Sequence, residues 1–548
     1  MTGMARKIPA DITTTVFDVI VIGAGINGAG VARDASMRGL KVLVLEKGDI
    51  GGGTTAWSTR LIHGGLRYLE HGEIGLVRES LREREHLFRI APHLVRPLPM
   101  LVPIYARGRR GALTVRAGMI AYDLLSFDKS LARHRMLTRE ETLRRLPRLN
   151  ADGLRGAALY YDAQVEFPER LALENVLSAR EHGASVLTYA RVERMTIADG
   201  KVEGVVFTDL LDGGVHTARA RLVVNVAGPW VDSVHKATSG TLRRMIGGTK
   251  GSHIVVNAFE GAPREAVYAE AEADGRPFFI IPWNTRYLIG TTDTRYKGDL
   301  DAVEADETEV DYLVGETNRV FPSAQLSRAS VVYTYAGVRP LPYVGERDER
   351  GITRRHFIHD HAPELPGLIS IIGGKLTTYR HLSELTVDAI FKRLRRDAPP
   401  CLTAQRPLPG AAVADFDAFR VDFKAHNSLH ANVSERLLRL YGVRAREVQA
   451  IASEDDALAE TLSDETDAIG AEIVFSFRHE MAETLCDSLW RRTMIGMTSA
   501  TVGIREAKVA ADIAARHLAW DAARVTREVA AYLAYVKRFH PRATGGEN

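Results

Sequence analysis

The sequence predicts an α/β (α+β) fold that opens with a strand–helix–strand unit and closes with a helical domain. Three observations support this prediction. A glycine-rich turn joins a short apolar strand to a helix near the N-terminus, residues 186–340 are rich in strand patterns, and residues 412–540 show helical periodicity with few strand signals. The length of 548 residues allows about three or four compact units.

The first elements form a βαβ unit. Phe17–Gly23 is a β-branched apolar run that predicts a buried strand, and Lys41–Gly48 predicts the next one. Between them, Ile26–Gly39 is a helix rich in small residues whose last glycine suits a C-terminal cap. A charged helical stretch, Glu73–Ile90, follows.

A second strand–turn–helix pattern precedes the helical C-terminal part of the chain. Leu368–Leu394 reads as strand, glycine turn and helix, and Arg395–Pro400 has the composition of a linker. Within the helical part, the acidic stretch of residues 453–472 is interpreted as a solvated helical face.

The composition is that of an ordinary globular protein. Apolar residues make up 45% and charged residues 26%, and 72 basic against 69 acidic residues give a net charge of +3. This balance gives no electrostatic footprint for nucleic acid. The two cysteines, Cys401 and Cys486, argue against a disulfide framework, indicate a reducing compartment and offer no metal site.

Neither terminus nor interior indicates membrane insertion. Residues 1–16 lack the apolar core of a secretory signal, and we expect a short flexible tail. No run approaches the roughly eighteen apolar residues of a spanning helix. We therefore expect a protein that is not integral to a membrane.

A dinucleotide signature lies at the first strand–helix turn. Gly23, Gly25 and Gly28 form G-x-G-x-x-G, whose glycines permit the tight turn, the approach of a pyrophosphate and close helix–strand packing. Glu46 ends the second strand, where its carboxylate is placed to accept a ribose hydroxyl and to repel a 2′-phosphate. FAD and NAD use the same unit, so this motif alone does not choose between them.

Later segments favour a flavin. A strand runs into Ala227 and Gly228, and a glycine turn with Gly374, Leu376 and Thr377 opens a helix, so both bring backbone groups toward a cofactor. A discontinuous site of this kind fits a large bound flavin. We find no second G-x-G-x-x-G for a nicotinamide, and we expect electrons to leave by another route.

The chain resembles the FAD-dependent, quinone-linked glycerol-3-phosphate dehydrogenases. The resemblance covers about residues 17–500 and rests on motifs in the family's order. These are "VIGAGINGAGVARDASMRGLKVLVLEKGD", "STRLIHGGLRYLEHGE", "REREHLFRIAPHL", "NVAGPWV", "KGSHIVV", "IIPW", "IGTTDTRYKGD", "YTYAGVRPL", "GGKLTTYRHLSE" and "LWRRTMIGM".

The resemblance implies a Rossmann-like FAD domain interleaved with a β-rich substrate domain, followed by an all-α domain. We expect a tail at 1–16, an oxidoreductase region at 17–398 and a helical domain at 399–548. Within the region we expect FAD-binding parts at about 17–95, 150–245 and 340–398, and substrate parts at about 96–149 and 246–339.

It also implies a reaction, the oxidation of sn-glycerol 3-phosphate to dihydroxyacetone phosphate. The C2 hydride goes to flavin N5, a base takes the hydroxyl proton, and electrons pass to a quinone. Three alternatives stay open: an oxidase that uses oxygen, a dehydrogenase of another polyol phosphate such as erythritol 4-phosphate, and a flavoprotein scaffold without turnover.

The stretch "STRLIHGGLRYLEHG" is placed by the resemblance against the reactive face of the flavin. His63 is then the candidate general base, because imidazole titrates nearest to neutral pH. Arg67 and Tyr68 would orient the substrate and stabilise developing charge. Gly64 and Gly65 would let the backbone pack against the ring.

The substrate phosphate needs fixed cations. Arg339 and Lys375 match the family's anion-binding positions, and Arg354 is a weaker candidate whose neighbour Arg355 could take its place. His71 is expected on the surface.

The run before this stretch departs from the family. Trp57 and Thr59 stand where small residues are expected, and Arg60 replaces a lysine. We expect the tryptophan to narrow the pocket or cover the ring, which would affect substrate fit rather than the chemistry.

The family implies a peripheral position on the cytoplasmic face of the membrane. Residues 107–127 join a basic cluster to an apolar, plausibly helical stretch that could rest in a lipid interface. The alternative is a helix packed on the substrate domain. A homodimer is kept open as the assembly.

Overall fold

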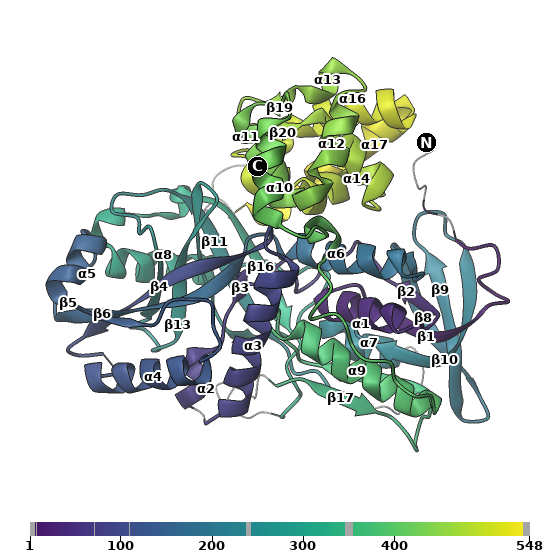
Figure 1. The fold of residues 1–548 in the computed structure, drawn as a ribbon, viewed down its shortest axis with the longest axis horizontal. Coiled ribbons are helices and arrows are strands. Elements are labelled where there is room, and N and C mark those ends of the chain that lie inside the picture. The colour runs from purple at the N-terminus through teal and green to yellow at the C-terminus, as the bar shows by residue number, and fades with distance from the viewer. Residues whose placement is uncertain are drawn as a thin grey trace.

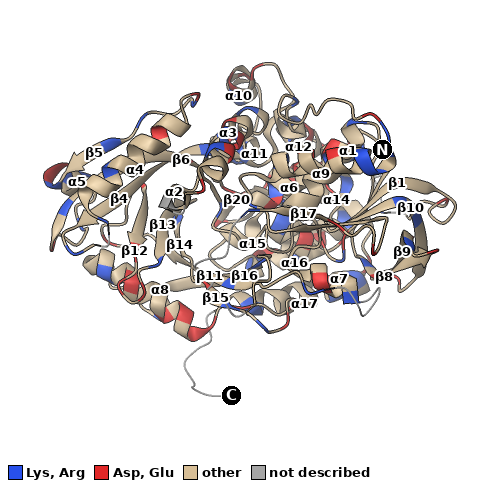
Figure 2. Ribbon diagram, turned by 90° about the horizontal axis from the view of Figure 1, so that it is seen from below, with Lys and Arg blue, Asp and Glu red and all other residues tan. Residues whose placement is uncertain are grey.

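Two sheets lie next to each other, and a helical unit sits over their junction (Figure 1). The computed structural model describes residues 6, 8–70, 72–108, 110–236, 243–345 and 355–540. Basic and acidic residues are interspersed along the ribbon (Figure 2).

The first sheet contains the strands that flank the glycine turn. Its order is β17-β18-β10-β1-β2-β7, in which β18 to β7 are parallel neighbours, β17 is an antiparallel edge, and β8 and β9 continue antiparallel from β10. The strands are β1 (Val16–Ile22), β2 (Val42–Leu45), β7 (Ser185–Leu187), β8 (Ala190–Ala198), β9 (Lys201–Asp209), β10 (Val215–Asn225), β17 (Phe357–Asp360) and β18 (Leu368–Ile372).

Both faces of this sheet are covered, which explains the continuous apolar runs of its strands. One face carries α1, which packs between α6 and α9, and the other packs against β8 and β9. The helices are α1 (Ile26–Met37), α6 (Pro168–Glu181), α7 (Val231–Lys236) and α9 (Tyr379–Leu394). The predicted βαβ unit is therefore confirmed.

The second sheet is mixed and mostly antiparallel, with the order β15-β11-β14-β13-β12-β4-β6-β3 and the side strands β16 and β5. Its strands are β3 (Leu61–Ile62), β4 (Val95–Tyr105), β5 (Arg135–Thr138), β6 (Leu154–Val165), β11 (Thr249–Asn257), β12 (Ala266–Glu270), β13 (Pro277–Trp283), β14 (Arg286–Gly290), β15 (Thr294–Arg295) and β16 (Val331–Arg339). Five helices accompany it: α2 (Leu66–Glu70), α3 (Ile74–Ile90), α4 (Ala112–Leu125), α5 (Arg139–Arg145) and α8 (Glu307–Val320).

The C-terminal unit is helical, as predicted. It comprises α10 (Phe416–Ala425), α11 (Ala431–Tyr441), α12 (Ala445–Ala452), α13 (Asp456–Ala459), α14 (Gly470–His479), the π-helical turn η7 (Asp487–Arg492), α15 (Ile495–Thr498), α16 (Ile504–Leu518), α17 (Ala522–Val536) and the 3-10 turn η8 (Lys537–Phe539). A small antiparallel sheet of β19 (Thr461–Ser463) and β20 (Thr466–Ile469) interrupts the helices.

The interpretation of the acidic stretch as a helical face was wrong. Residues 453–472 form the short helix α13, the β19–β20 hairpin and the start of α14. Glu472 is buried, accepts a hydrogen bond from the Ile469 N–H (3.1 Å) that caps α14, and pairs with Arg436 (2.9 Å). Its charge thus stabilises a helix start and a buried ion pair rather than a solvated surface.

Helix α4 has one buried face and one exposed apolar face. Val115, Met119 and Tyr122 are buried against the second sheet, so this face of the stretch 107–127 is not open to lipid. Leu113 and Leu124 are 83% and 70% exposed. Among the described residues, none of the helices combines the length and apolar character needed to cross a bilayer.

Candidate active site

A cavity of about 430 Å³ lies at the carboxyl ends of β1, β2 and β10. Ligands of open α/β sheets bind at this edge. Seven of the predicted cofactor residues line it: Gly23, Gly25, Glu46, Ala227, Gly228, Gly374 and Leu376.

The glycine turn fits a dinucleotide. Gly23 has a φ of +105°, and a Cβ there would lie 2.8 Å from the Val226 carbonyl oxygen. At Gly28 a Cβ would lie 1.9 Å from the Gly23 carbonyl oxygen, so this residue packs the helix on the turn without lining the cavity. The space in front of the N-terminus of α1 is left to a ligand, as the motif requires.

Glu46 is oriented by backbone groups. Its carboxylate accepts hydrogen bonds from the N–H groups of Ala24 (2.7 Å) and Gly48 (2.8 Å). Burial raises the pKa of Glu46 although both hydrogen bonds oppose this shift. The side chain is thereby held at the cavity wall, where a ribose hydroxyl can reach it.

A second cavity of about 290 Å³ lies between the two sheets and adjoins the first. It brings together His63, Gly65, Tyr68, Arg339 and Lys375 from the predicted site. The two cavities share five lining residues: Thr54, Pro340, Gly373, Gly374 and Lys375.

His63 stands where the short strand β3 ends. Its backbone N–H donates to Thr377 Oγ1 at 3.1 Å, which ties it to the loop before α9. Thr377 is buried and lines neither cavity, and its hydroxyl holds the backbone of His63 in place. Lys375 Nζ lies 3.7 Å from the centroid of the Tyr68 ring.

The two glycines after His63 act differently from each other. Gly65 has a φ of +78° and lines the second cavity. Gly64 lines neither cavity, and a Cβ there would lie 2.3 Å from the Tyr122 hydroxyl. The need for glycine at position 64 therefore comes from packing against α4 rather than from the cavity.

Arg339 ends β16 and is fixed on several sides. Its guanidinium donates to Asp293 Oδ1 (3.0 Å), Thr291 Oγ1 (3.1 Å) and the Thr292 carbonyl oxygen (3.1 Å). A Cβ on Gly251 would lie 2.2 Å from Arg339 Nη2, so the glycine of "KGSHIVV" leaves room for this cation. The cation is rigidly placed and already balanced in part by Asp293.

Sequence reasoning missed several charged residues of this cavity. Arg276, Asp162 and Asp293 line it together with Arg339 and Lys375. Asp162 Oδ1 accepts hydrogen bonds from the Tyr122 hydroxyl (2.6 Å), Arg84 (2.8 Å) and the Gly64 N–H (3.2 Å). Asp162 was not detectable as a site residue because it sits mid-strand in β6, without a motif of its own.

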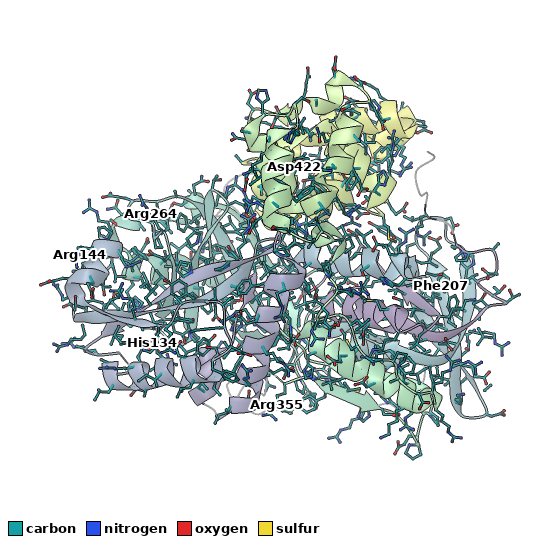
Figure 3. The ribbon with its side chains drawn as sticks, in the orientation of Figure 1. His134, Arg144, Phe207, Arg264, Arg355 and Asp422 are labelled. Atoms are coloured by element: carbon teal, nitrogen blue, oxygen red, sulfur yellow. The ribbon has the colours of Figure 1, made fainter. Side chains whose placement is uncertain are left out.

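Two site candidates, and His71, which was expected on the surface, fall partly or wholly outside the described part of the chain. The side chain of Arg67, and all of His71 and Arg354, lie outside the described residues. Arg355 is exposed and lies below α3 in the view of Figure 3. Its carbonyl oxygen would be 2.8 Å from a Cβ on Gly373.

Trp57 lines the first cavity and not the second. Its position at the cofactor cavity is compatible with the expectation that it covers the ring, and its effect on substrate fit stays a prediction. Thr59 lines the second cavity and contacts His253 Nε2 (2.9 Å). Arg60 is fully buried and pairs with Glu169 (2.8 Å), so it supports the fold.

Comparison with known proteins agrees with this geometry. Residues 18–380 match the family of FAD dependent oxidoreductases, and residues 401–525 match the C-terminal domain of alpha-glycerophosphate oxidase. A glycerol-3-phosphate dehydrogenase from Synechocystis sp. is 46% identical over 97% of this chain and 98% of its own length. An aerobic glycerol-3-phosphate dehydrogenase from Staphylococcus haemolyticus is 35% identical over 89% of this chain and 88% of its own.

The fold comparison gives the same answer. The glycerol-3-phosphate dehydrogenase from Bacillus halodurans, solved in complex with FAD, superposes with a TM-score of 0.80 at 30% identity and covers 98% of both chains. With a glycine cradle and two adjoining cavities in the same fold, the chain belongs to the family of FAD-dependent glycerol-3-phosphate dehydrogenases.

Proposed function

We propose that the protein oxidises sn-glycerol 3-phosphate to dihydroxyacetone phosphate with bound FAD and passes the electrons to a quinone. The observation that carries the proposal is the second cavity, which joins a histidine and fixed cations to the wall of the cofactor cavity. Bound FAD supplies the hydride acceptor. The names of the relatives support the substrate.

The residues of the second cavity suit an anionic alcohol. A ring nitrogen of His63 would accept the proton of the C2 hydroxyl. Arg339 would bind the phosphate through its planar guanidinium, and Lys375 would add a point charge. Tyr68, stacked under Lys375, would orient the substrate together with Arg67. The cavity lining contains three fixed cations and two carboxylates, which favours an anion.

The FAD site fits the residues already described. The turn with Gly23 and Gly25 would hold the pyrophosphate, and Glu46 would bind the ribose of the adenosine. The loop with Gly374 and Leu376 would contact the flavin from the junction of the two cavities.

The test is an anaerobic titration of the purified protein with glycerol 3-phosphate while the oxidised flavin band is recorded. We expect bleaching, fast recovery on addition of a soluble quinone and slow recovery in air. Fast recovery in air would identify an oxidase instead. An unbleached band would refute the substrate, and erythritol 4-phosphate would be titrated next.

A quinone acceptor dissolves in lipid, and we propose that α4 is the contact with the membrane surface. Leu113, Leu124 and Phe127 are 83%, 70% and 78% exposed, next to basic residues of 107–116. Replacing Leu113 and Leu124 together with glutamate should reduce binding to anionic vesicles in a flotation assay by about tenfold or more.

The matched control for this experiment is Val421→Glu on α10, because Val421 is similarly exposed at 71% but lies on the C-terminal unit. We expect the control variant to float with the vesicles like the unmodified protein. Equal binding of the α4 variant and the control would exclude α4 as the membrane contact.

A further inference from the structure

A pair of arginines links the C-terminal unit to the start of the cofactor site. Arg491 and Arg492 lie in the π-helical turn η7, and both are buried. Arg492 donates to both oxygens of Asp49 at 2.7 Å, and Arg491 Nε donates to Asp49 Oδ2 at 2.5 Å. Local π-helical turns frequently occur at functional sites, and this one places two cations on a single carboxylate.

The electrostatics show that the link is strong. Burial would raise the pKa of Asp49, but Arg492 and Arg491 outweigh burial and hold this pKa below its usual value. The charge of Arg491 is also balanced by Asp487, whose carboxylate accepts a hydrogen bond from Arg491 at 2.6 Å. Separating a buried ion pair leaves an uncompensated charge. The ion pairs of Asp49 therefore hold the C-terminal unit against the loop after β2.

Asp49 belongs to the loop between β2 and β3 that encloses the first cavity. Gly48, Asp49, Thr54, Thr55 and Trp57 of this loop line that cavity. The Thr55 hydroxyl oxygen also accepts a hydrogen bond from the Ile26 N–H at 3.0 Å, at the N-terminus of α1. The two arginines therefore position a loop that contacts the dinucleotide cradle.

The C-terminal unit also contributes directly to the cavity wall. Arg491, Tyr535 and Arg538 line the first cavity. Tyr535 and Arg538 lie beyond residue 525, where the match to the family's C-terminal domain ends. The segment of α17 and η8 thus reaches the cofactor cavity from the end of the C-terminal unit.

Aromatic stacking holds the end of this segment in place. Phe539 stacks on Trp490 with ring centroids 4.1 Å apart and lies 5.4 Å from Trp57. Arg538 donates to the Val303 carbonyl oxygen at 2.9 Å. Within the part of the chain that the structure describes, Arg538 pairs with no carboxylate, so its positive charge is available to an anion in the cavity.

We propose that the C-terminal segment of residues 522–540 is a strap over the cofactor cavity, in which Arg538 and Tyr535 retain the anionic dinucleotide. The inference rests on FAD as the cofactor of the proposed function, but it requires neither the substrate nor the acceptor. Its test measures the binding of FAD without turnover. The strap proposal can therefore fail while the proposed reaction is confirmed, and the proposed reaction can fail while the strap proposal is confirmed.

The experiment compares Arg538→Met with Arg527→Met, a matched variant of an exposed arginine on α17, the helix that precedes η8. FAD is removed from each full-length protein, and the apoprotein is titrated with FAD while the fluorescence of the free flavin is recorded. We expect the Kd of Arg538→Met to rise about tenfold or more, because a charge-assisted contact is lost. The Kd of Arg527→Met should not change.

Thermal unfolding of the apoproteins separates a cofactor contact from a general loss of stability. If the strap acts on FAD, the two apoproteins unfold at the same temperature, and added FAD raises the Tm of Arg538→Met less than that of Arg527→Met. An unchanged Kd overturns the proposal. The proposal is also overturned if the Arg538→Met apoprotein has a lower Tm than the Arg527→Met apoprotein while added FAD raises the Tm of both by the same amount.

Phe539→Ala provides a second, independent variant. It removes the stack on Trp490 and the cation–π contact of this ring with the Arg538 guanidinium (5.7 Å), but it keeps the arginine itself. We expect faster loss of FAD on dilution, measured as the rate at which flavin fluorescence appears. A rate equal to that of the unmodified protein would show that the strap does not retain the cofactor.

Discussion

Replacing His63 with glutamine is expected to slow the reduction of the bound flavin by glycerol 3-phosphate by about 10²- to 10⁴-fold. Glutamine can still form hydrogen bonds but does not accept a proton near neutral pH. The backbone N–H of residue 63 would keep its bond to Thr377, so the loop should stay in place. Stopped-flow absorbance of the flavin band under anaerobic conditions measures this rate.

The matched control is His381→Gln. His381 is half-buried on α9, bonds to Glu79 at 3.0 Å and lines neither cavity. The control should reduce its flavin at the unmodified rate, and both variants should retain their FAD. A His63→Gln variant that is reduced as fast as the control would remove His63 from the role of general base.

Replacing Arg339 with methionine is expected to lower kcat/KM for glycerol 3-phosphate by about 10²- to 10³-fold. The cation is lost, and the carboxylate of Asp293, which loses this partner, faces the phosphate across the cavity. The double variant Arg339→Met with Asp293→Asn should recover part of this loss, because it removes the repulsive charge. Steady-state kinetics with a soluble quinone measure all three proteins.

Arg264→Met serves as the control for this series. Arg264 is exposed on the unit of the second sheet and is labelled in Figure 3. It should leave kcat/KM unchanged. If the single and the double variants at 339 and 293 were equally impaired, the carboxylate would not act on the substrate. A single variant with unchanged kcat/KM would exclude Arg339 as a phosphate ligand.

Local patterns were sufficient to predict the parts of the fold that depend on short-range geometry. The strand–glycine–helix unit around Gly23 and the helix at 74–90 follow from periodicity and turn chemistry that act within a few residues. The acidic stretch was misread because charge alone does not distinguish a solvated helix from a hairpin. Its buried Glu472 depends on Arg436, which lies 36 residues away.

The residues of the candidate site also fall into those that local motifs predict and those that they do not. His63, Arg339 and Lys375 were found through motifs, and the structure brings them to one cavity. Asp162, Arg276 and Asp293 escaped detection, since each contributes only because a distant strand or loop folds beside it.

The α/β class, the dinucleotide cradle and the family could be read from the sequence, because their signals lie in contiguous motifs. Which charges face each other depends on how distant segments pack. The distance between Asp49 and Arg492 is 443 residues along the chain and 2.7 Å in space. Ion pairs of this kind form only when segments far apart in the sequence pack together, and no local pattern encodes that packing.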